Sequence, residues 1–143
     1  RRIRAAGLKV RVVPTVTSLQ LAFAAVALPW DDALLVSLHG NNPAPALEAL
    51  RSHPKVGLLT DGRTGLPQIV AATAGLGRSY VLAERLGEHD EQVRVLSEEQ
   101  AREVTDIAQP NVVLVLAHHP DDAAAIGEQT AIAGGARPVG AEA

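Results

Sequence analysis

The sequence predicts a mixed α/β fold, with one open sheet and helices between most of its strands. Short apolar or β-branched runs alternate with segments of helical character, and Gly-containing polar clusters follow several of the runs. Hydrophobic residues make up 47% of the 143 residues, whereas aromatic residues make up only 2%. Alternating strands and helices are typical of sheets with parallel strands, so we expect Val, Leu, Ile and Ala to form the core of such a sheet.

A strand and a helix are predicted near the N-terminus. Residues 9–13 read Lys-Val-Arg-Val-Val, a β-branched run that a proline ends. Thr17 and Ser18 are residues of the helix-capping type, and an apolar helix is expected over residues 18–27. Residues 33–38 form a continuous apolar run before a His-Gly pair, which is the pattern of a buried strand.

The alternation continues through the middle of the chain. Turn residues precede a short helix at residues 46–51, and an apolar strand follows at residues 55–60. A helix is expected over residues 66–74, because Pro67 suits a first helical turn and two glycines follow the last one. Residues 78–83 then alternate in character, as a strand does.

The last predicted elements are a strand, a helix and a final strand. Residues 92–96 alternate, and the short polar loop before them predicts antiparallel pairing with the strand at residues 78–83. Ser97 and Gln100 have capping-box spacing, so a helix begins there. Residues 111–117 are a last apolar strand. After His118 no period remains, and we expect residues 118–143 to be a flexible tail.

Charge and composition exclude several classes of protein. The net charge is −3, and the chain lacks the basic face of a nucleic-acid binder. No apolar run reaches the roughly 18 residues of a transmembrane helix, and the absence of cysteine excludes disulfides and thiolate chemistry. The chain has no starting Met and opens inside a basic, helix-like segment, so we expect it to be part of a longer protein.

Polar clusters follow three of the predicted strands, where α/β sheets bind their ligands. They contain His39, Thr60 with Asp61, and Glu84 with Arg85. His39 suits a general base or a partner for a carboxylate, but a partly exposed histidine in a turn is the more common explanation of such a residue. Asp61 suits a ribose hydroxyl or an Asx-type turn. Glu84 and Arg85 suit a charged network around an acidic substrate, or a linker.

Two further polar clusters have both a structural and a functional interpretation. The hydroxyls of Thr17 and Ser18 at a helix start can hold an anion, or they can serve as caps alone. His118 and His119 precede two aspartates, but adjacent side chains on an extended segment point in opposite directions, so we expect no metal site. The chain also has no nucleophile elbow, no Gly-x-Gly-x-x-Gly sequence and no phosphate loop.

The order of these motifs resembles one known family. Residues 12–22 are similar to the segment of tetrapyrrole (corrin/porphyrin) methylases that reads proline, small residue, aliphatic, Ser/Thr, Ser. The Leu-Pro-Trp-Asp-Asp run at residues 28–32 and the Val-Ser-Leu-His-Gly run at residues 36–40 resemble the precorrin-6Y C5,15-methyltransferase branch of cobalamin biosynthesis. So do the runs Leu-Leu-Thr-Asp at residues 58–61 and Glu-Arg-Leu-Gly at residues 84–87.

The resemblance implies a fold, an activity and a cofactor. Members of this family have two α/β domains with S-adenosylmethionine between them, and this branch methylates a precorrin at carbon. The chain would hold the last helix and strand of the N-terminal cofactor domain in residues 1–16 and the C-terminal methylase domain in residues 17–117. The residues implied as cofactor-binding are Thr17, Ser18, Thr60 and Asp61. The residues implied as substrate-binding are His39, Arg85 and Glu84.

The resemblance also implies partners and leaves an alternative open. A cytoplasmic homo-oligomer is expected, with a decarboxylating methyltransferase as a separate partner or a further domain. Asn41 stands where an arginine often follows the His-Gly pair of the family. Because the family's Gly-rich cofactor loop is absent, a non-catalytic α/β binding or assembly module derived from the same fold is the alternative function. A hydrolase is less well supported, since no nucleophile motif is present.

Overall fold

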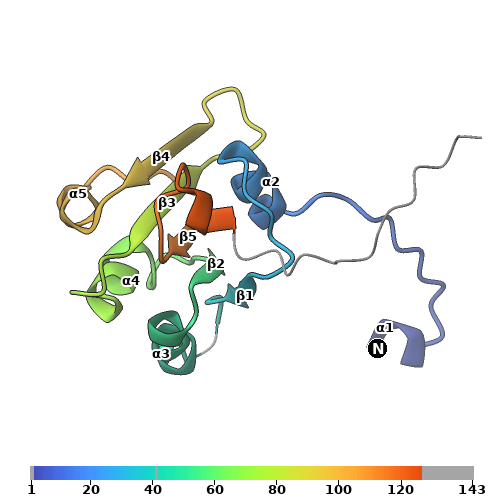
Figure 1. Cartoon of the computed structure of the whole chain (residues 1–143). Coiled ribbons are helices and arrows are strands. Elements are labelled where there is room, and N and C mark those ends of the chain that lie inside the picture. Colours follow the sequence, from blue (N-terminus) through green and yellow to red (C-terminus); the bar gives the residue numbers. More distant parts are fainter. Residues whose placement is uncertain (1, 41, 127–143) are drawn as a thin grey trace, which may run out of the picture.

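A five-stranded sheet with the order β1-β2-β5-β3-β4 forms the centre of the molecule (Figure 1). The computed structural model describes residues 2–40 and 42–126. The strands are β1 (Leu34–Ser37), β2 (Lys55–Leu59), β3 (Ser79–Glu84), β4 (Gln92–Leu96) and β5 (Asn111–Leu116). β1 pairs with β2 in parallel, and the remaining pairs are antiparallel. The mixed α/β sheet predicted from the sequence is confirmed.

Helices cover both faces of the sheet (Figure 1). They are α2 (Ser18–Ala25), α3 (Ala44–Ser52), α4 (Leu66–Ala72), α5 (Glu98–Glu103) and the 3₁₀ helix η1 (Ala123–Ile126), whereas the short helix α1 (Arg2–Ala5) lies apart from the sheet. On one face, Leu50, Ile69 and Ala101 bring α3, α4 and α5 into a core with Tyr80 and Leu82. Because the other face is also covered, all six residues of β5 are buried.

The second core lies between α2 and the opposite face of the sheet. Leu19 and Phe23 of α2 pack there with Val81 of β3 and Leu114 of β5. Gly57 of β2 makes this close approach possible: a Cβ atom added to it would lie 3.1 Å from the Leu19 Cδ2 atom and 3.2 Å from the Phe23 Cε2 atom. The absence of a side chain at Gly57 therefore helps to set the position of α2, whose first residue lies at the site described below.

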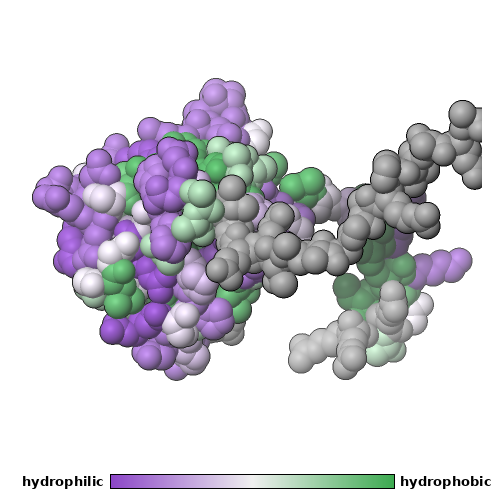
Figure 2. All heavy atoms as spheres, in the orientation of Figure 1, coloured by the Kyte–Doolittle hydropathy of each residue, from purple (hydrophilic) through white to green (hydrophobic). Residues whose placement is uncertain are grey.

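One predicted strand is not formed. Residues 9–13 have no strand pairing and lie on an extended arm that leads from α1 toward α2 (Figure 1). Val12 of this arm is 75% exposed, and apolar residues gather along the arm in the hydropathy view (Figure 2). A β-branched sequence forms a strand only when another strand satisfies its backbone hydrogen bonds, and none of the described strands lies beside residues 9–13.

The pairing pattern corrects one expectation and confirms another. β3 and β4 are antiparallel, as predicted from the short loop between them. Parallel pairing holds for β1 and β2 only, because β5 lies between β2 and β3 and is antiparallel to both. Local alternation cannot reveal such an insertion, since β5 comes from the far end of the sequence.

The region after β5 was expected to be a tail. Its described part, to residue 126, contains η1, in which Ala125 packs into the core beside α2. Residues 127–143 of the expected tail lie outside the described residues. Within the described ranges, no helix is long and apolar enough to cross a membrane.

Candidate functional site

Three of the predicted polar clusters meet at one edge of the sheet. β2 and β3 are both antiparallel to β5, and β1 is parallel to β2, so β1, β2 and β3 all run in the same direction. Their carboxyl ends therefore lie at one edge, followed by His39, Thr60 and Arg85, respectively. The amino end of β5, at Asn111, lies at the same edge. This arrangement places the clusters where α/β sheets bind ligands.

A cavity of about 410 Å³ opens at this edge, beside the start of α2. Its lining consists of Ser18, His39, Leu59, Thr60, Asp61, Gly62, Ala83, Leu86, Gln109, Pro110, Asn111 and Val112. The volume lies within the range of small-molecule sites, about 300–1,000 Å³. Side chains from β2, β3 and β5 supply an apolar wall, whereas Ser18, His39 and Asp61 supply polar groups. Such a lining suits a ligand that has both an apolar ring and polar substituents.

Thr60 links the end of β2 to the start of β5, beside the cavity. Its side-chain oxygen lies 2.8 Å from the Asn111 carbonyl oxygen and 2.7 Å from Asn111 Oδ1, so its one hydroxyl hydrogen is directed at Asn111. Asn111 in turn donates from Nδ2 to the Ala108 carbonyl at 2.9 Å. Thr60 is only 3% exposed. The sequence reasoning missed Asn111, although a polar residue at the start of an otherwise apolar strand was a signal.

Asp61 shapes the loop after β2. Its Oδ1 atom accepts hydrogen bonds from the backbone N–H groups of Thr64 at 2.7 Å and Arg63 at 2.9 Å. These two bonds lower the pKa of Asp61, and the Gly40 N–H and the His39 ring lower it further. Asp61 is therefore a turn-forming residue, as one of the two interpretations held, and its ionised carboxylate also lies at the cavity.

The two residues at the start of α2 have different roles. Thr17 caps the helix: its hydroxyl oxygen accepts from the Gln20 N–H at 3.3 Å, and its own N–H donates to Gln20 Oε1 at 2.9 Å. Thr17 is exposed and is not part of the cavity lining. Ser18 is the first helical residue and does line the cavity. The cap thus places Ser18 at the site.

Glu84 lies on the opposite face of the sheet from the cavity. It is 1% exposed, and its Oε1 atom accepts from the Ala108 N–H at 2.7 Å. Its Oε2 atom accepts from Arg94 Nε at 3.1 Å and from Arg94 Nη2 at 2.9 Å. Glu84 therefore fixes the segment that leads to Asn111, and its carboxylate is already fully engaged.

Arg85 follows Glu84 in the left-handed backbone region, with φ of 51°. Its N–H donates to the Pro110 carbonyl at 2.8 Å, and its Nε donates to Asp90 Oδ1 at 2.7 Å. The bond to Asp90 raises the pKa of Arg85 and lowers that of Asp90. Neither Arg85 nor Glu84 lines the cavity, but the next residue, Leu86, does. The expected charged network is present, and its ion pairs join residues of this chain: Arg85 with Asp90, and Glu84 with Arg94.

A second cavity of about 210 Å³ adjoins the first. The two cavities share Asp61, Gly62, Gln109 and Asn111. The second cavity is also bordered by Arg63, Pro67 and Ile107. The two cavities thus lie next to each other at the ends of β2 and β5, and the sequence had given no indication of the second one.

The fold and this site define a class of protein. Residues 1–102 match the model of the tetrapyrrole (corrin/porphyrin) methylases. The chain therefore belongs to the tetrapyrrole methylase family, as the resemblance of its motifs indicated.

A curated relative narrows the comparison within that class. Over 91 residues the chain is 29% identical to the cobalt-precorrin-7 C(5)-methyltransferase of Salmonella typhimurium. The match covers 62% of this chain and 44% of the relative. The same figures hold for the enzyme of Salmonella typhi. The chain thus spans less than half the length of the curated relatives it matches.

Solved structures share the fold. The X-ray structure of a cobalt precorrin-4 methyltransferase superposes with a TM-score of 0.62 at 18% identity, covering 80% of this chain and 55% of that one. The uroporphyrin-III C-methyltransferase of Thermus thermophilus, in complex with S-adenosyl homocysteine, gives a TM-score of 0.60 at 22% identity with the same coverage. S-adenosylmethionine is the cofactor of this family, as expected from the sequence.

Proposed function

We propose that this chain forms the C-terminal part of an S-adenosylmethionine-dependent methyltransferase that acts on a precorrin. The observation that carries the proposal is the 410 Å³ cavity at the common strand edge, together with the family match. The Salmonella relative is named for methylation at C5, and the sequence resembles the C5,15 branch. We therefore propose that the carbon methylated is C5 of a precorrin, of the precorrin-6Y or precorrin-7 type.

The cavity fits part of the cofactor. Leu59, Ala83 and Val112 would pack against the flat adenine ring, and Ser18 and Asp61 offer polar groups at the rim. Bound S-adenosylmethionine would supply an activated methyl group. Thr17 would act indirectly, by capping α2 and so placing Ser18, and Thr60 would act through its bond to Asn111.

The chemistry requires positioning more than a nucleophilic side chain. Methyl transfer from a sulfonium to an electron-rich carbon is an in-line displacement, and its rate depends on holding the two reactants in the correct geometry. The rigid links from Thr60 to Asn111 and from Glu84 to Ala108 suit that requirement. We assign no catalytic residue.

Substrate binding is proposed for His39, with weaker support for Arg85 and Glu84. His39 is exposed at the rim of the cavity, where it would meet a peripheral carboxylate of the precorrin. Arg85 and Glu84 lie at the same edge but already have partners in Asp90 and Arg94. A direct contact from either residue would have to compete with these ion pairs. An oligomeric state, a decarboxylating partner and a cytoplasmic location are proposals that rest on the family resemblance alone.

Blocking the cavity tests the proposal. In the protein as its gene encodes it, Ser18→Phe should abolish S-adenosyl homocysteine binding in calorimetry, because the ring would occupy the cavity. Ser18 is half-buried, so the fold should survive, and circular dichroism would verify this. Ser52→Phe is the matched control, since Ser52 is exposed at the end of α3 and lines neither cavity. Unchanged affinity in Ser18→Phe would refute the assignment of the cavity to the cofactor.

One observation favours the alternative, a non-catalytic binding or assembly module. The arm before α2 exposes Leu8, Val12, Val13 and Val16, which would suit a protein interface. A wild-type protein that self-associates or binds a partner, but binds neither S-adenosyl homocysteine nor a tetrapyrrole, would support this alternative.

A further inference from the structure

Arg63 differs from the other cationic side chains of the folded domain. Over residues 18–126, every other lysine or arginine side chain bonds a carboxylate or a backbone carbonyl. The pairs are Arg51 with the Ala72 carbonyl, Lys55 with Asp32, Arg78 with the Leu50 and Arg51 carbonyls, Arg85 with Asp90, Arg94 with Glu84, and Arg102 with Glu98. The Arg63 guanidinium has no such partner among the described residues, although it borders a cavity.

Hydrogen bonds fix the backbone of the loop that carries Arg63, but the Arg63 side chain bonds no described residue. The Arg63 N–H donates to Asp61 Oδ1 at 2.9 Å, which holds the backbone. The two side chains form no ion pair with each other, and Asp61 Oδ1 is occupied by the backbone N–H groups of Arg63 and Thr64. The carboxylate of Asp61 would repel an anion on its own side of the cavity. An anionic group would therefore be directed toward the guanidinium.

Arg63 borders the smaller cavity, which lies beside the larger one. The cavity that it borders shares Asp61, Gly62, Gln109 and Asn111 with the larger one, so the two cavities lie next to each other. We propose that Arg63 binds a carboxylate of a ligand bound at this edge of the sheet. A guanidinium can bind a carboxylate through two parallel hydrogen bonds. The carboxylate belongs either to a tetrapyrrole substituent or to the amino-acid end of the cofactor, and this inference rests on the proposed function.

Paired ligands distinguish the two sources of the carboxylate. The probes are uroporphyrin III with its methyl ester, and S-adenosyl homocysteine with 5′-methylthioadenosine, which lacks the amino-acid carboxylate. Calorimetry and porphyrin fluorescence would measure the affinities of the protein as its gene encodes it. Arg63→Gln should weaken the binding of one of the two free acids roughly tenfold. The ester or the truncated nucleoside should bind to Arg63→Gln as it does to wild type. High salt should reduce the difference, because Arg63 is exposed.

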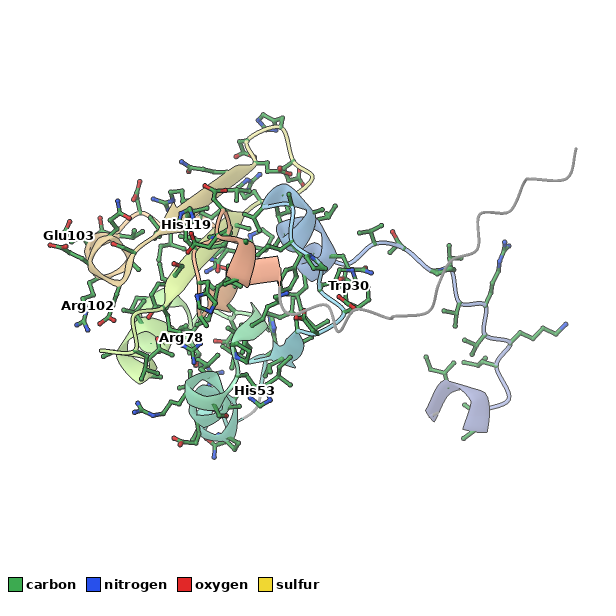
Figure 3. The ribbon with its side chains drawn as sticks, viewed as in Figure 1. Trp30, His53, Arg78, Arg102, Glu103 and His119 are labelled. Carbon is green, nitrogen blue, oxygen red and sulfur yellow. The ribbon has the colours of Figure 1, made fainter. Side chains whose placement is uncertain are left out.

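Arg102→Gln is the matched control. Arg102 is an exposed arginine on α5 that pairs with Glu98 and borders neither cavity, and Figure 3 shows it on the outer side of its helix. Arg102→Gln should leave the affinity for both free acids unchanged. If wild type binds a probe and Arg63→Gln binds it equally well, the inference about Arg63 is wrong and the proposed function stands. If wild type binds neither free acid, the proposed function fails and the inference fails with it.

Discussion

Hydrogen-bonded carboxylates define the site at the scale of single residues. Asp61 forms the loop after β2, Glu84 fixes the segment before β5, and Asp90 holds Arg85. The turn at Asp61 was one of two interpretations of the sequence, whereas the bond from Ala108 to Glu84 joins residues 24 positions apart, which neither propensity nor periodicity predicts. The sequence did place His39, Thr60 and Asp61 near one another, because side chains that follow parallel strands lie at one edge of a sheet. The same argument placed Glu84 and Arg85 there, but neither lines the cavity, and Ser18 was grouped with Thr60 and Asp61 by the family resemblance.

The pH dependence of stability should report the bonds of Asp61. Its pKa in the folded chain is lowered from 3.8, mainly by the N–H groups of Thr64 and Arg63. A carboxylate with a lowered folded pKa adds stability above its unfolded pKa and loses it as the pH falls through the folded value. We therefore expect Asp61→Asn to melt below wild type at pH 7, with the difference shrinking as the pH falls below 3.8 toward the lowered pKa of the folded chain.

Thermal melts followed by circular dichroism at pH 7 and over a series of acidic pH values would measure this difference. Asp31→Asn is the control, because Asp31 is exposed and makes no hydrogen bond within the described residues. A difference between Asp61→Asn and wild type that persists undiminished in acid would show that the carboxylate charge is not responsible.

At the scale of elements, Arg78 connects the sheet to α3. It is 9% exposed, and its Nη2 atom donates to the Leu50 carbonyl at 3.1 Å and to the Arg51 carbonyl at 3.0 Å. These carbonyls belong to the last turn of α3, whose dipole also favours a cation there. Figure 3 shows Arg78 near the start of β3, from where it reaches α3.

Replacing Arg78 should therefore destabilise the fold more than replacing a surface arginine. We expect Arg78→Met to lower the free energy of unfolding by about 1–3 kcal/mol, because buried carbonyls lose their donor. Arg78→Lys should recover part of the loss, since the charge remains but the fork of donors does not. Urea denaturation would measure both variants, with Arg102→Gln expected to change stability by less than about 1 kcal/mol. Equal effects of Arg78→Met and Arg102→Gln would contradict the capping role.

The limits of sequence prediction also appear at this scale. The strands at residues 55–60 and 111–117 were found because buried β-branched runs are visible locally. The same pattern at residues 9–13 was misleading, because a local run does not reveal whether a partner strand exists. The insertion of β5 between β2 and β3 depends on burial of both faces of β5, which is a property of the assembled sheet.

At the scale of the whole molecule, the cavity is enclosed only in part. The chain covers less than half of its curated relatives, and its cavity lies at an open sheet edge. We therefore expect the 143-residue chain alone to bind S-adenosyl homocysteine weakly or not at all. Micromolar S-adenosyl homocysteine should leave its melting temperature unchanged, whereas tight binding would raise it. A clear rise would show that this half of the site is sufficient.

The exposed arm before α2 has a consequence for how the chain behaves in concentrated solution. Leu8, Val12 and Val13 present apolar, β-prone surface with unpaired backbone groups, which is a template for strand pairing between molecules. Lys9 and Arg11 alternate with these residues and would bring like charges together in such a pairing. Charge repulsion along the arm thus opposes aggregation at low ionic strength, and added salt, by screening it, removes that protection.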